Sequence, residues 1–220
     1  MTVPEKEDVP DPVVYVLDDD VELCESVTWL LGSINVDPVV MHSADEFLEH
    51  YDGGHPVCMV LDVRMPRMSG TRLQEELVDR APHASIIFVS AHGDIRMSVR
   101  TMQRGALHFL EKPYDPQQLL DVVQEGMVHA AERFREHHTR LSVQHRIDAL
   151  TPREREILHL VVEGLPSQNI ARRLGMSVKT VDVHRARIKA KTDSDSINTL
   201  VRDVLRYEAQ ISSEPGSAQK

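Results

Sequence analysis

The chain has 220 residues, a formal net charge of -10, and 41% hydrophobic against 27% charged residues. This length fits one large or two small domains, and the composition is that of a globular protein. No apolar stretch is long enough to cross a membrane, and the polar, proline-containing N-terminus is unlike a signal peptide. We therefore expect a cytoplasmic protein with no membrane partner.

Charge is unevenly distributed along the chain. Residues 1–147 hold 13 basic and 25 acidic side chains, whereas residues 148–209 hold 11 basic and 9 acidic ones. Seven of the basic residues lie between Arg172 and Lys191, where Asp182 is the only acid. An acidic first part and a basic stripe in the second predict two domains with different partners, and the stripe leaves room for a DNA-binding face.

Strands and helices are expected to alternate in the first half of the chain. Strand-like apolar runs cover residues 13–17, 39–41, 57–62, 86–90 and 106–111, and helical signals separate them. Strands that alternate with helices need crossover connections, which produce a parallel sheet. We therefore expect a tail over residues 1–11 and a flavodoxin-like (βα)5 domain, with a parallel five-stranded sheet, over residues 12–128.

A long helix is expected to follow this domain. Asp115 and Pro116 form a helix start, and nothing breaks the helix strongly before Asp148. Its first part should cover the sheet, and residues 129–147 should form a linker helix between the two domains.

An all-α domain of four helices is expected over residues 148–209, before a tail over residues 210–220. Thr151 and Glu154 form a capping box with Pro152 at the first helical position. Further on, a short helix, a turn at Gly175 and a basic helix capped by Ser177 follow one another. This order predicts a helix-turn-helix.

Polar side chains follow four of the apolar runs. Asp62 ends the run over 57–62, and the acids from Asp18 to Asp20 follow the run over 13–17. Ser90 and Lys112 follow the fourth and fifth runs. Because the carboxyl ends of parallel strands meet at one edge, where ligands bind in open α/β sheets, we expect these groups to lie close together.

Carboxylates that converge in this way repel one another, by about 4 kcal/mol at ~4 Å and an effective dielectric constant near 20. A divalent cation relieves that repulsion, and carboxylate oxygens with water suit Mg²⁺. A single aspartate at a strand end is more often a helix cap. Acids, a hydroxyl and an ammonium together predict a site for a phosphoryl group on a carboxylate.

With these positions the chain resembles the two-component response regulators of the FixJ/NarL type, which combine a receiver domain with a LuxR-like helix-turn-helix. The matching segments are Asp18–Asp19, DVRMP at 62–66 with Gly70 after it, SAHGD at 90–94, FLEKP at 109–113 and TVDVH at 180–184. The resemblance covers nearly the whole chain apart from its tails.

The resemblance implies that a sensor histidine kinase phosphorylates Asp62 in the presence of Mg²⁺. It makes Asp19 a direct metal ligand and Asp18 a ligand that acts directly or through water. The backbone carbonyl of Arg64 would be the third ligand from the protein.

The same resemblance implies roles in signalling for three further residues. Lys112 would pair with the phosphoryl group, and Ser90 would hydrogen-bond one of its oxygens. Phe109 matches an aromatic residue that moves inward when the hydroxyl shifts.

Helical geometry, at about 100° per residue, divides the basic helix into two faces. Val181, His184 and Ile188 share the face expected to pack inside. The opposite face and its flanks should enter the major groove of promoter DNA, and the expected contact residues are Lys179, Thr180, Asp182, Val183, Ala186, Arg187 and Lys191. Within this set, the small residues approach thymine methyls, Asp182 accepts from a cytosine amino group, and the remainder contact phosphates.

A row of residues along the long helix recurs at three- and four-residue steps: Leu120, Val123, Met127, Ala130, Phe134, His137 and Leu141. The row is either core packing at one end of a single helix or a coiled-coil seam. A seam from Met127 through Phe134 to Leu141 would join two copies when the protein is phosphorylated. RNA polymerase is a further candidate partner.

Two other functions compete with this interpretation. A phosphatase of the haloacid-dehalogenase type also uses a strand-end aspartate with Mg²⁺, but it needs a second aspartate where this chain has Arg64. A regulator that ignores phosphorylation would not need Asp62, Ser90 and Lys112 together. We therefore expect a transcriptional regulator and not an enzyme.

Overall fold

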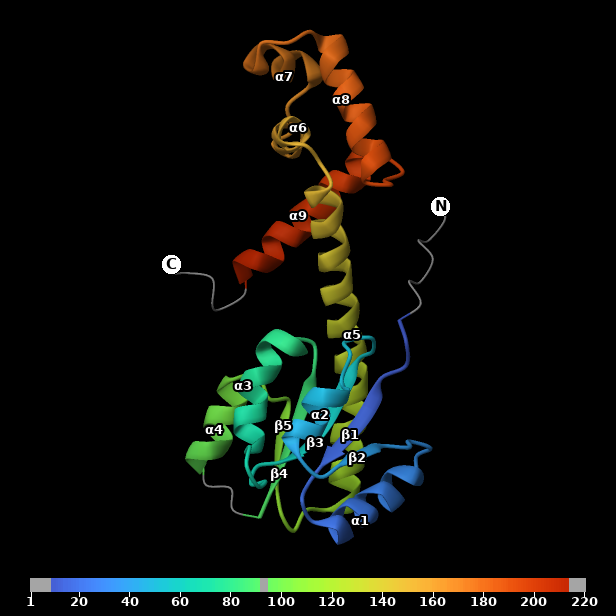
Figure 1. Ribbon diagram of the computed structural model, residues 1–220, viewed down its shortest axis with the longest axis vertical. Coiled ribbons are helices and arrows are strands. Elements are labelled where there is room, and N and C mark those ends of the chain that lie inside the picture. Colours follow the sequence, from blue (N-terminus) through green and yellow to red (C-terminus); the bar gives the residue numbers. More distant parts are fainter. Residues whose placement is uncertain (1–8, 92–94, 214–220) are drawn as a thin grey trace. The chain divides into compact units, whose positions relative to one another are not determined.

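A computed structural model of the chain describes residues 9–91 and 95–213, and it describes side chains as far as residue 205 (Figure 1). It divides into two compact units, residues 1–137 and 138–220. The division falls inside the linker helix expected over residues 129–147. Gly93 and Asp94, part of a segment that matched the receiver pattern, lie outside the described residues.

Within the described residues, five parallel strands form one sheet in the order β2-β1-β3-β4-β5. The strands are β1 (Val13–Leu17), β2 (Val39–Met41), β3 (Val57–Asp62), β4 (Ser85–Ser90) and β5 (His108–Glu111). In the register of the sheet, Leu17 is opposite Leu61, and Asp62 is opposite Val89. The residues that follow β1 and β3 therefore emerge at the same edge.

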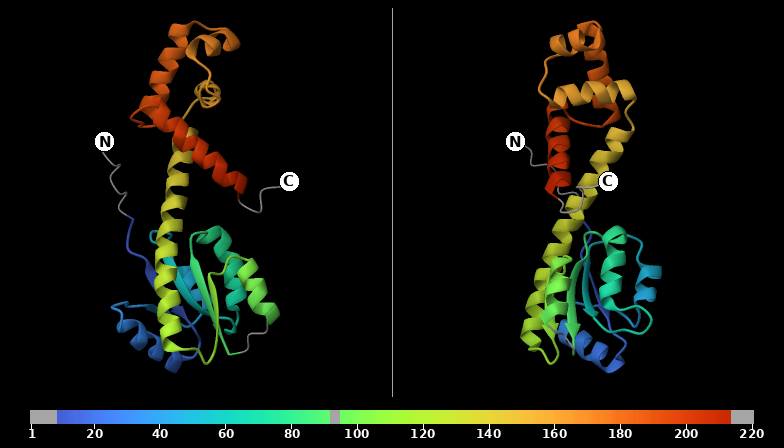
Figure 2. Two further views of the ribbon diagram at one scale, coloured as in Figure 1. Left: turned by 180° about the vertical axis from the view of Figure 1, so that it is seen from behind. Right: turned by 90° about the vertical axis from the view of Figure 1, so that its left-hand side faces the viewer.

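Helices cover both faces of the sheet (Figure 2). On one face lie α1 (Val21–Gly32) and the first part of α5 (Pro116–Asp148); on the other lie α2 (Ala44–His50), α3 (Gly70–Arg80) and α4 (Ile95–Gln103). The expected flavodoxin-like (βα)5 arrangement is confirmed. Every residue of β3 and β4 is buried, which explains why their sequences are apolar without alternation.

The helix α5 packs very closely against the sheet at one point. A Cβ atom on Gly126 would lie 2.7 Å from the Sγ atom of Cys58 and 3.2 Å from Cδ1 of Ile87. Glycine therefore lets the helix approach β3 and β4, at a cost in helix propensity of about 1 kcal/mol relative to alanine. Burial raises the pKa of the Cys58 thiol to about 12.

The long helix is confirmed as α5, and part of its three- and four-residue row is core. Leu120, Val123 and Ala130 are buried in the apolar core between α5 and the sheet. The Phe134 side chain is only 3% exposed, and its ring lies edge-on to His83 with centroids 4.8 Å apart. Leu141, in contrast, is 51% exposed. These early members therefore pack within their own chain.

In the second unit, four helices follow the end of α5: α6 (Pro152–Val162), α7 (Ser167–Leu174), α8 (Val178–Lys191) and α9 (Ile197–Ser213). Thr151 and Glu154 exchange both hydrogen bonds of the expected capping box. Gly175 ends α7 in the left-handed conformation, with φ +64°, which turns the chain toward α8. Ile157, Ile170 and Val181 lie in the apolar core that the helices share.

Candidate phosphoacceptor site and DNA-binding helix

Three strand ends bring Asp18, Asp62 and Lys112 together. The Nζ atom of Lys112 donates to Asp18 Oδ2 at 2.7 Å and to Asp62 Oδ1 at 2.9 Å. The second oxygen of Asp62 accepts from the backbone N–H of Arg64 at 2.6 Å. Both carboxylates are nearly buried, Asp62 being 7% exposed. The structure thus assembles two of the acids and the ammonium that the sequence predicted at one edge.

The electrostatics of this group follow from burial and from the shared ammonium. Burial raises the pKa of Asp62, and the hydrogen bonds from Lys112 and from the Arg64 N–H offset this rise only in part. Burial alone lowers the pKa of Lys112, but the hydrogen bonds and charges of Asp18 and Asp62 outweigh it, so that the pKa lies above its ordinary value. Lys112 is therefore a fixed cation between two acids.

Ser90 and Phe109 lie on the strands next to this group. Ser90 is buried at the end of β4, one residue after Val89, which pairs with Asp62 in the sheet. The backbone N–H of Val63 donates to the Val89 carbonyl at 3.3 Å, which ties the loop after Asp62 to β4. Phe109 is half-buried, and its ring centroid lies 6.4 Å from that of Phe88. Both residues thus lie on strands next to the site.

The other two acids that follow β1 are exposed. Asp20 is the N-cap of α1, where its Oδ1 atom accepts from the Leu23 N–H at 3.2 Å. Asp19 is exposed. Within residues 9–91 and 95–213, no group of three or more His, Cys, Asp or Glu side chains is arranged to hold a metal ion. The Lys112 ammonium lies between the carboxylates of Asp18 and Asp62.

Gly70 lies close to the backbone of Asp62, whereas the sequence identified Gly70 only as part of a motif. Its N–H donates to the Val63 carbonyl at 3.1 Å. A Cβ atom on Gly70 would lie 2.2 Å from the backbone oxygen of Asp62 and 2.9 Å from Cγ of Leu61. The start of α3 is therefore pressed against the backbone of Asp62, which only glycine permits.

An apolar groove opens beside Lys112. Residues of α1 and of the loop from β5 to α5 line it, among them Leu23, Trp29, Leu30, Pro113 and Tyr114. The Trp29 side chain, the only tryptophan of the chain, is 80% exposed. Sequence patterns do not reveal that this exposed aromatic side chain lines the same groove as Lys112.

The faces of α8 are as helical geometry predicts. Val181 and Ile188 are buried, and His184 is half-buried. All of the expected DNA contacts are exposed: Lys179, Thr180, Asp182, Val183, Ala186, Arg187 and Lys191. Val183 is an apolar residue that is 45% exposed, which the domain's own packing does not explain.

Lys191 has a structural partner as well as an exposed position. Its Nζ atom donates to Glu154 Oε2 at 2.8 Å, and the Glu154 side chain is almost fully buried. The hydrogen bond from Lys191, together with those from Thr151, lowers the pKa of Glu154 to about 2 despite its desolvation. The Lys191 ammonium thus joins the end of α8 to the start of α6, and a substitution there would disturb the domain as well as any phosphate contact.

A parallel α/β domain with an acid, a hydroxyl and a lysine at its strand ends, joined to a helix-turn-helix domain, defines the class of phosphoacceptor-controlled DNA-binding regulators. Comparison with known families agrees. Residues 14–124 match the response regulator receiver domain, and residues 148–203 match the bacterial regulatory proteins of the luxR family. The chain belongs to the response regulators, and it is a phosphorylation-controlled transcriptional regulator.

Individual relatives resemble the chain over most of its length. The transcriptional regulatory protein TdiR of Thauera aromatica is 39% identical over 90% of this chain and 88% of its own. The transcriptional regulatory protein FixJ of Azorhizobium caulinodans is 40% identical over 87% of this chain and 91% of its own. The solved structure of the response regulator StyR is 40% identical, with a TM-score of 0.75 over 90% of this chain and 100% of that one.

Among the described residues, none of the helices has the length and hydropathy that crossing a bilayer requires.

Proposed function

We propose that Asp62 is the phosphoacceptor of this response regulator. The observation that carries the proposal is the contact of Lys112 with both Asp18 and Asp62 at the carboxyl ends of three strands. A carboxylate oxygen of Asp62 attacks the phosphorus of a phosphohistidine on a sensor histidine kinase; the P–N bond breaks, and the histidine leaves. Lys112 then pairs with the negative oxygens of the phosphoryl group.

The residues fit a magnesium ion by their chemistry. The carboxylates of Asp18, Asp19 and Asp62 and the backbone carbonyl of Arg64 are hard oxygen donors, which Mg²⁺ prefers, and they would hold the ion. Mg²⁺ supplies positive charge that offsets the charge on the phosphoryl oxygens. Lys112 contacts two of these carboxylates and so already offsets part of their negative charge.

Ser90 and Phe109 relay the change in this proposal. The Ser90 hydroxyl donates a hydrogen bond to a phosphoryl oxygen, and Phe109 on the neighbouring strand turns inward into the space that Ser90 leaves. Ser90 lies on β4 and Phe109 lies on β5. These two strands pair directly, so that a shift of one residue displaces the other. The result is a regulator that stores a phosphoryl group and does not turn it over as a phosphatase would.

The second domain binds promoter DNA through the exposed face of α8, in the cytoplasm, with RNA polymerase as a further partner. Val183 and Ala186 permit close approach to base edges, Asp182 reads a base, and Lys179, Thr180 and Arg187 contact phosphates. Lys191 adds a phosphate contact at the end of the helix. The exposed position of every one of these residues supports this face over any other face of α8.

Two substitutions distinguish the residues of this face that contact DNA phosphates from the residue that recognises a base. Lys179→Ala should weaken binding about equally on all DNA sequences and reduce the slope of log K against log salt by about one, because it removes one phosphate contact. Asp182→Ala should instead change the preferred base at one position. Both are measured by binding titrations on a selected site and on unrelated DNA at several salt concentrations. If both variants lost the same affinity on every DNA sequence, the proposed DNA-contacting face of α8 would be refuted.

Dimerisation of the phosphorylated protein is the remaining part of the proposal. Two helix-turn-helix domains must be held about one DNA turn apart to bind a two-fold symmetric site. Of the proposed contacts, Phe134 is buried within the receiver and Met127 is half-buried against its core, whereas Leu141 is exposed. Leu141 is therefore the residue by which the contact can be tested without damage to the receiver.

Leu141→Asp should raise the dimer dissociation constant of the phosphorylated protein by about tenfold or more, since burying a leucine is worth ~1.5–3 kcal/mol. Analytical ultracentrifugation measures the constant. Val128→Asp is the matched control, because Val128 is an exposed apolar residue of the same helix outside the row. If Leu141→Asp and Val128→Asp had the same dimer dissociation constant, the row of residues along α5 would serve core packing only.

A further inference from the structure

Among the described residues, the two ends of α4 differ in how deeply their side chains are buried. Among its residues, Thr101 in the last turn is the one that is buried. Ile95 is 82% exposed, and Val99 and Met102 also face solvent. Met97 is partly buried against the receiver core. The N-terminal half of α4 thus exposes Ile95 and Val99 and contacts the core through Met97, and segments with few buried apolar side chains open locally at low free-energy cost.

The C-terminal end of α4 is closed by several hydrogen bonds. The Thr101 carbonyl accepts from the Ala106 N–H at 3.1 Å, and Gly105 makes the turn with φ +91°. The Thr101 hydroxyl donates back to the Ser98 carbonyl at 2.9 Å. The carbonyls at this end of α4 therefore accept hydrogen bonds from the residues that follow the helix, and they also accept from α3.

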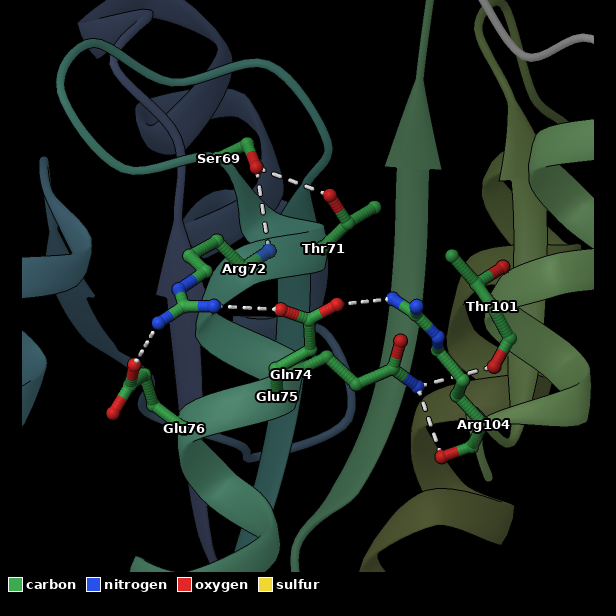
Figure 3. A network of polar contacts seen from close by, with 8 residues as sticks. All are labelled: Ser69, Thr71, Arg72, Gln74, Glu75, Glu76, Thr101 and Arg104. Atoms are coloured by element: carbon green, nitrogen blue, oxygen red, sulfur yellow. Dashed lines mark hydrogen bonds and ion pairs between the residues drawn. The ribbon is translucent and has the colours of Figure 1, made fainter.

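Gln74 of α3 supplies that additional contact (Figure 3). Its Nε2 atom donates to the carbonyls of Thr101 at 3.1 Å and of Arg104 at 3.4 Å, both in or just after the last turn of α4. Gln74 is 3% exposed, and its bond to the Thr101 carbonyl is buried, whereas its bond to the Arg104 carbonyl is partly buried. A buried amide that spans two carbonyls of another helix fixes the position of that helix end.

Glu75 adds a second, exposed connection between the helices. Its carboxylate accepts from Arg104 at 2.5 Å and from Arg72 at 3.0 Å, so that it bridges α4 and α3. Arg72 also pairs with Glu76, within α3 only. Exposed ion pairs contribute little by themselves, so the buried Gln74 is the stronger of the two connections.

The two ends of α4 are therefore connected to different parts of the receiver. Its C-terminal end is joined through Gln74 to α3, whose first residue, Gly70, is pressed against the Asp62 backbone. Its N-terminal end follows Ser90 after residues 91–94. A change at Ser90 can move the weakly packed end while the other end stays fixed.

We propose that Gln74 is a positioning residue that holds the C-terminal end of α4 as a pivot, so that phosphorylation of Asp62 turns only the N-terminal half of α4. The inference rests on the proposed function, because it takes Asp62 as the phosphoacceptor. Gln74 touches no reacting atom and acts through the carbonyls of Thr101 and Arg104.

The test uses the full chain, with Asp62 phosphorylated by acetyl phosphate and Mg²⁺. Three readouts are taken: the label on Asp62, amide hydrogen exchange over residues 95–106, and the ratio of DNA affinities with and without phosphorylation. In the wild type, phosphorylation should change exchange over residues 95–100 and leave it unchanged over residues 101–106. Equal changes over both segments would overturn the pivot.

Gln74→Leu keeps the size of the side chain and removes its donors. It should be labelled as fully as the wild type, while the Arg104 and Ala106 amides exchange about tenfold faster and the affinity ratio falls by about tenfold, as the loss of a buried hydrogen bond implies. Glu76→Gln is the matched control, since it breaks an exposed pair of α3 without touching α4. A normal affinity ratio in Gln74→Leu, with faster exchange at Ala106, would make Gln74 merely structural.

If Gln74→Leu takes no label, Glu75→Gln decides in its place, because Glu75 is exposed and reaches the same helix end. It should speed exchange at Arg104 and lower the affinity ratio, to a smaller extent. Faster exchange with an unchanged ratio would overturn the pivot. Labelling remains the separate test of the function: a wild type that takes no label on Asp62 contradicts the phosphoacceptor and not the hydrogen bonds of Gln74.

Discussion

Asp62→Asn should reduce phosphorylation to background, from a phosphorylated kinase and from a small phosphodonor alike. The amide has the size of the carboxylate but lacks the nucleophilic oxygen. It also lacks the negative charge that pairs with Lys112 and that would bind a metal ion. The fold should persist, because Asp18 still accepts from Lys112. The measurement is incorporation of labelled phosphate, with its lability in acid and base as the signature of an acyl phosphate.

The matched control is Asp45→Asn. Asp45 lies at the start of α2, outside the strand-end group, and pairs only loosely with Arg67 at 3.6 Å. It should be labelled like the wild type. Full labelling of Asp62→Asn, or equal loss in both variants, would remove Asp62 from its role and with it the proposed phosphorylation site.

Gly70→Ala should have the next largest effect, on stability and on phosphorylation together. The added Cβ atom would lie 2.2 Å from the Asp62 backbone oxygen, so either α3 or the end of β3 must move. Overpacking of this kind typically costs about 1–3 kcal/mol. Because the displaced atom belongs to Asp62, we also expect slower labelling. Denaturant titration followed by circular dichroism gives the free energy of unfolding, and labelling gives the rate.

Gly32→Ala is a control on the same kind of substitution. Gly32 is the last residue of α1, and no atom lies within 4 Å of the position that its Cβ would take. Alanine should therefore be neutral there or stabilise the protein by about 0.5–1 kcal/mol through the unfolded chain. If Gly70→Ala is as stable as Gly32→Ala and is labelled equally fast, the close contact of α3 with Asp62 has no consequence.

Much of the site could be predicted because it depends on local patterns. Apolar runs that end in Asp62, Ser90 or Lys112 place those groups at strand ends, and parallel pairing brings strand ends to one edge. The sequence did not distinguish the acids from one another. Asp18 contacts Lys112 while Asp19 is exposed and Asp20 caps α1, because consecutive residues leave the strand in different directions.

The seam along α5 shows where periodicity stops being informative. The three- and four-residue steps correctly place Phe134 and Leu141 on related positions of one helix, yet Phe134 is buried against His83 and Leu141 is exposed. Periodicity records which residues share a face. It does not record what that face covers, which depends on residues about fifty positions away in the sequence.

The amino-acid sequence by itself determined the class of fold, the helix caps at Thr151 and Ser177, the long helix, the polar groups at the strand ends and the inward face of α8, because each follows from spacing along a few turns or one strand. Only the tertiary structure decided the pairing of Lys191 with Glu154, the close approach of Gly70 to Asp62, the exposure of Ile95 on α4 and the hold of Gln74 on the end of that helix. These contacts join residues distant in sequence, and the packing of whole elements selects them from many chemically acceptable partners.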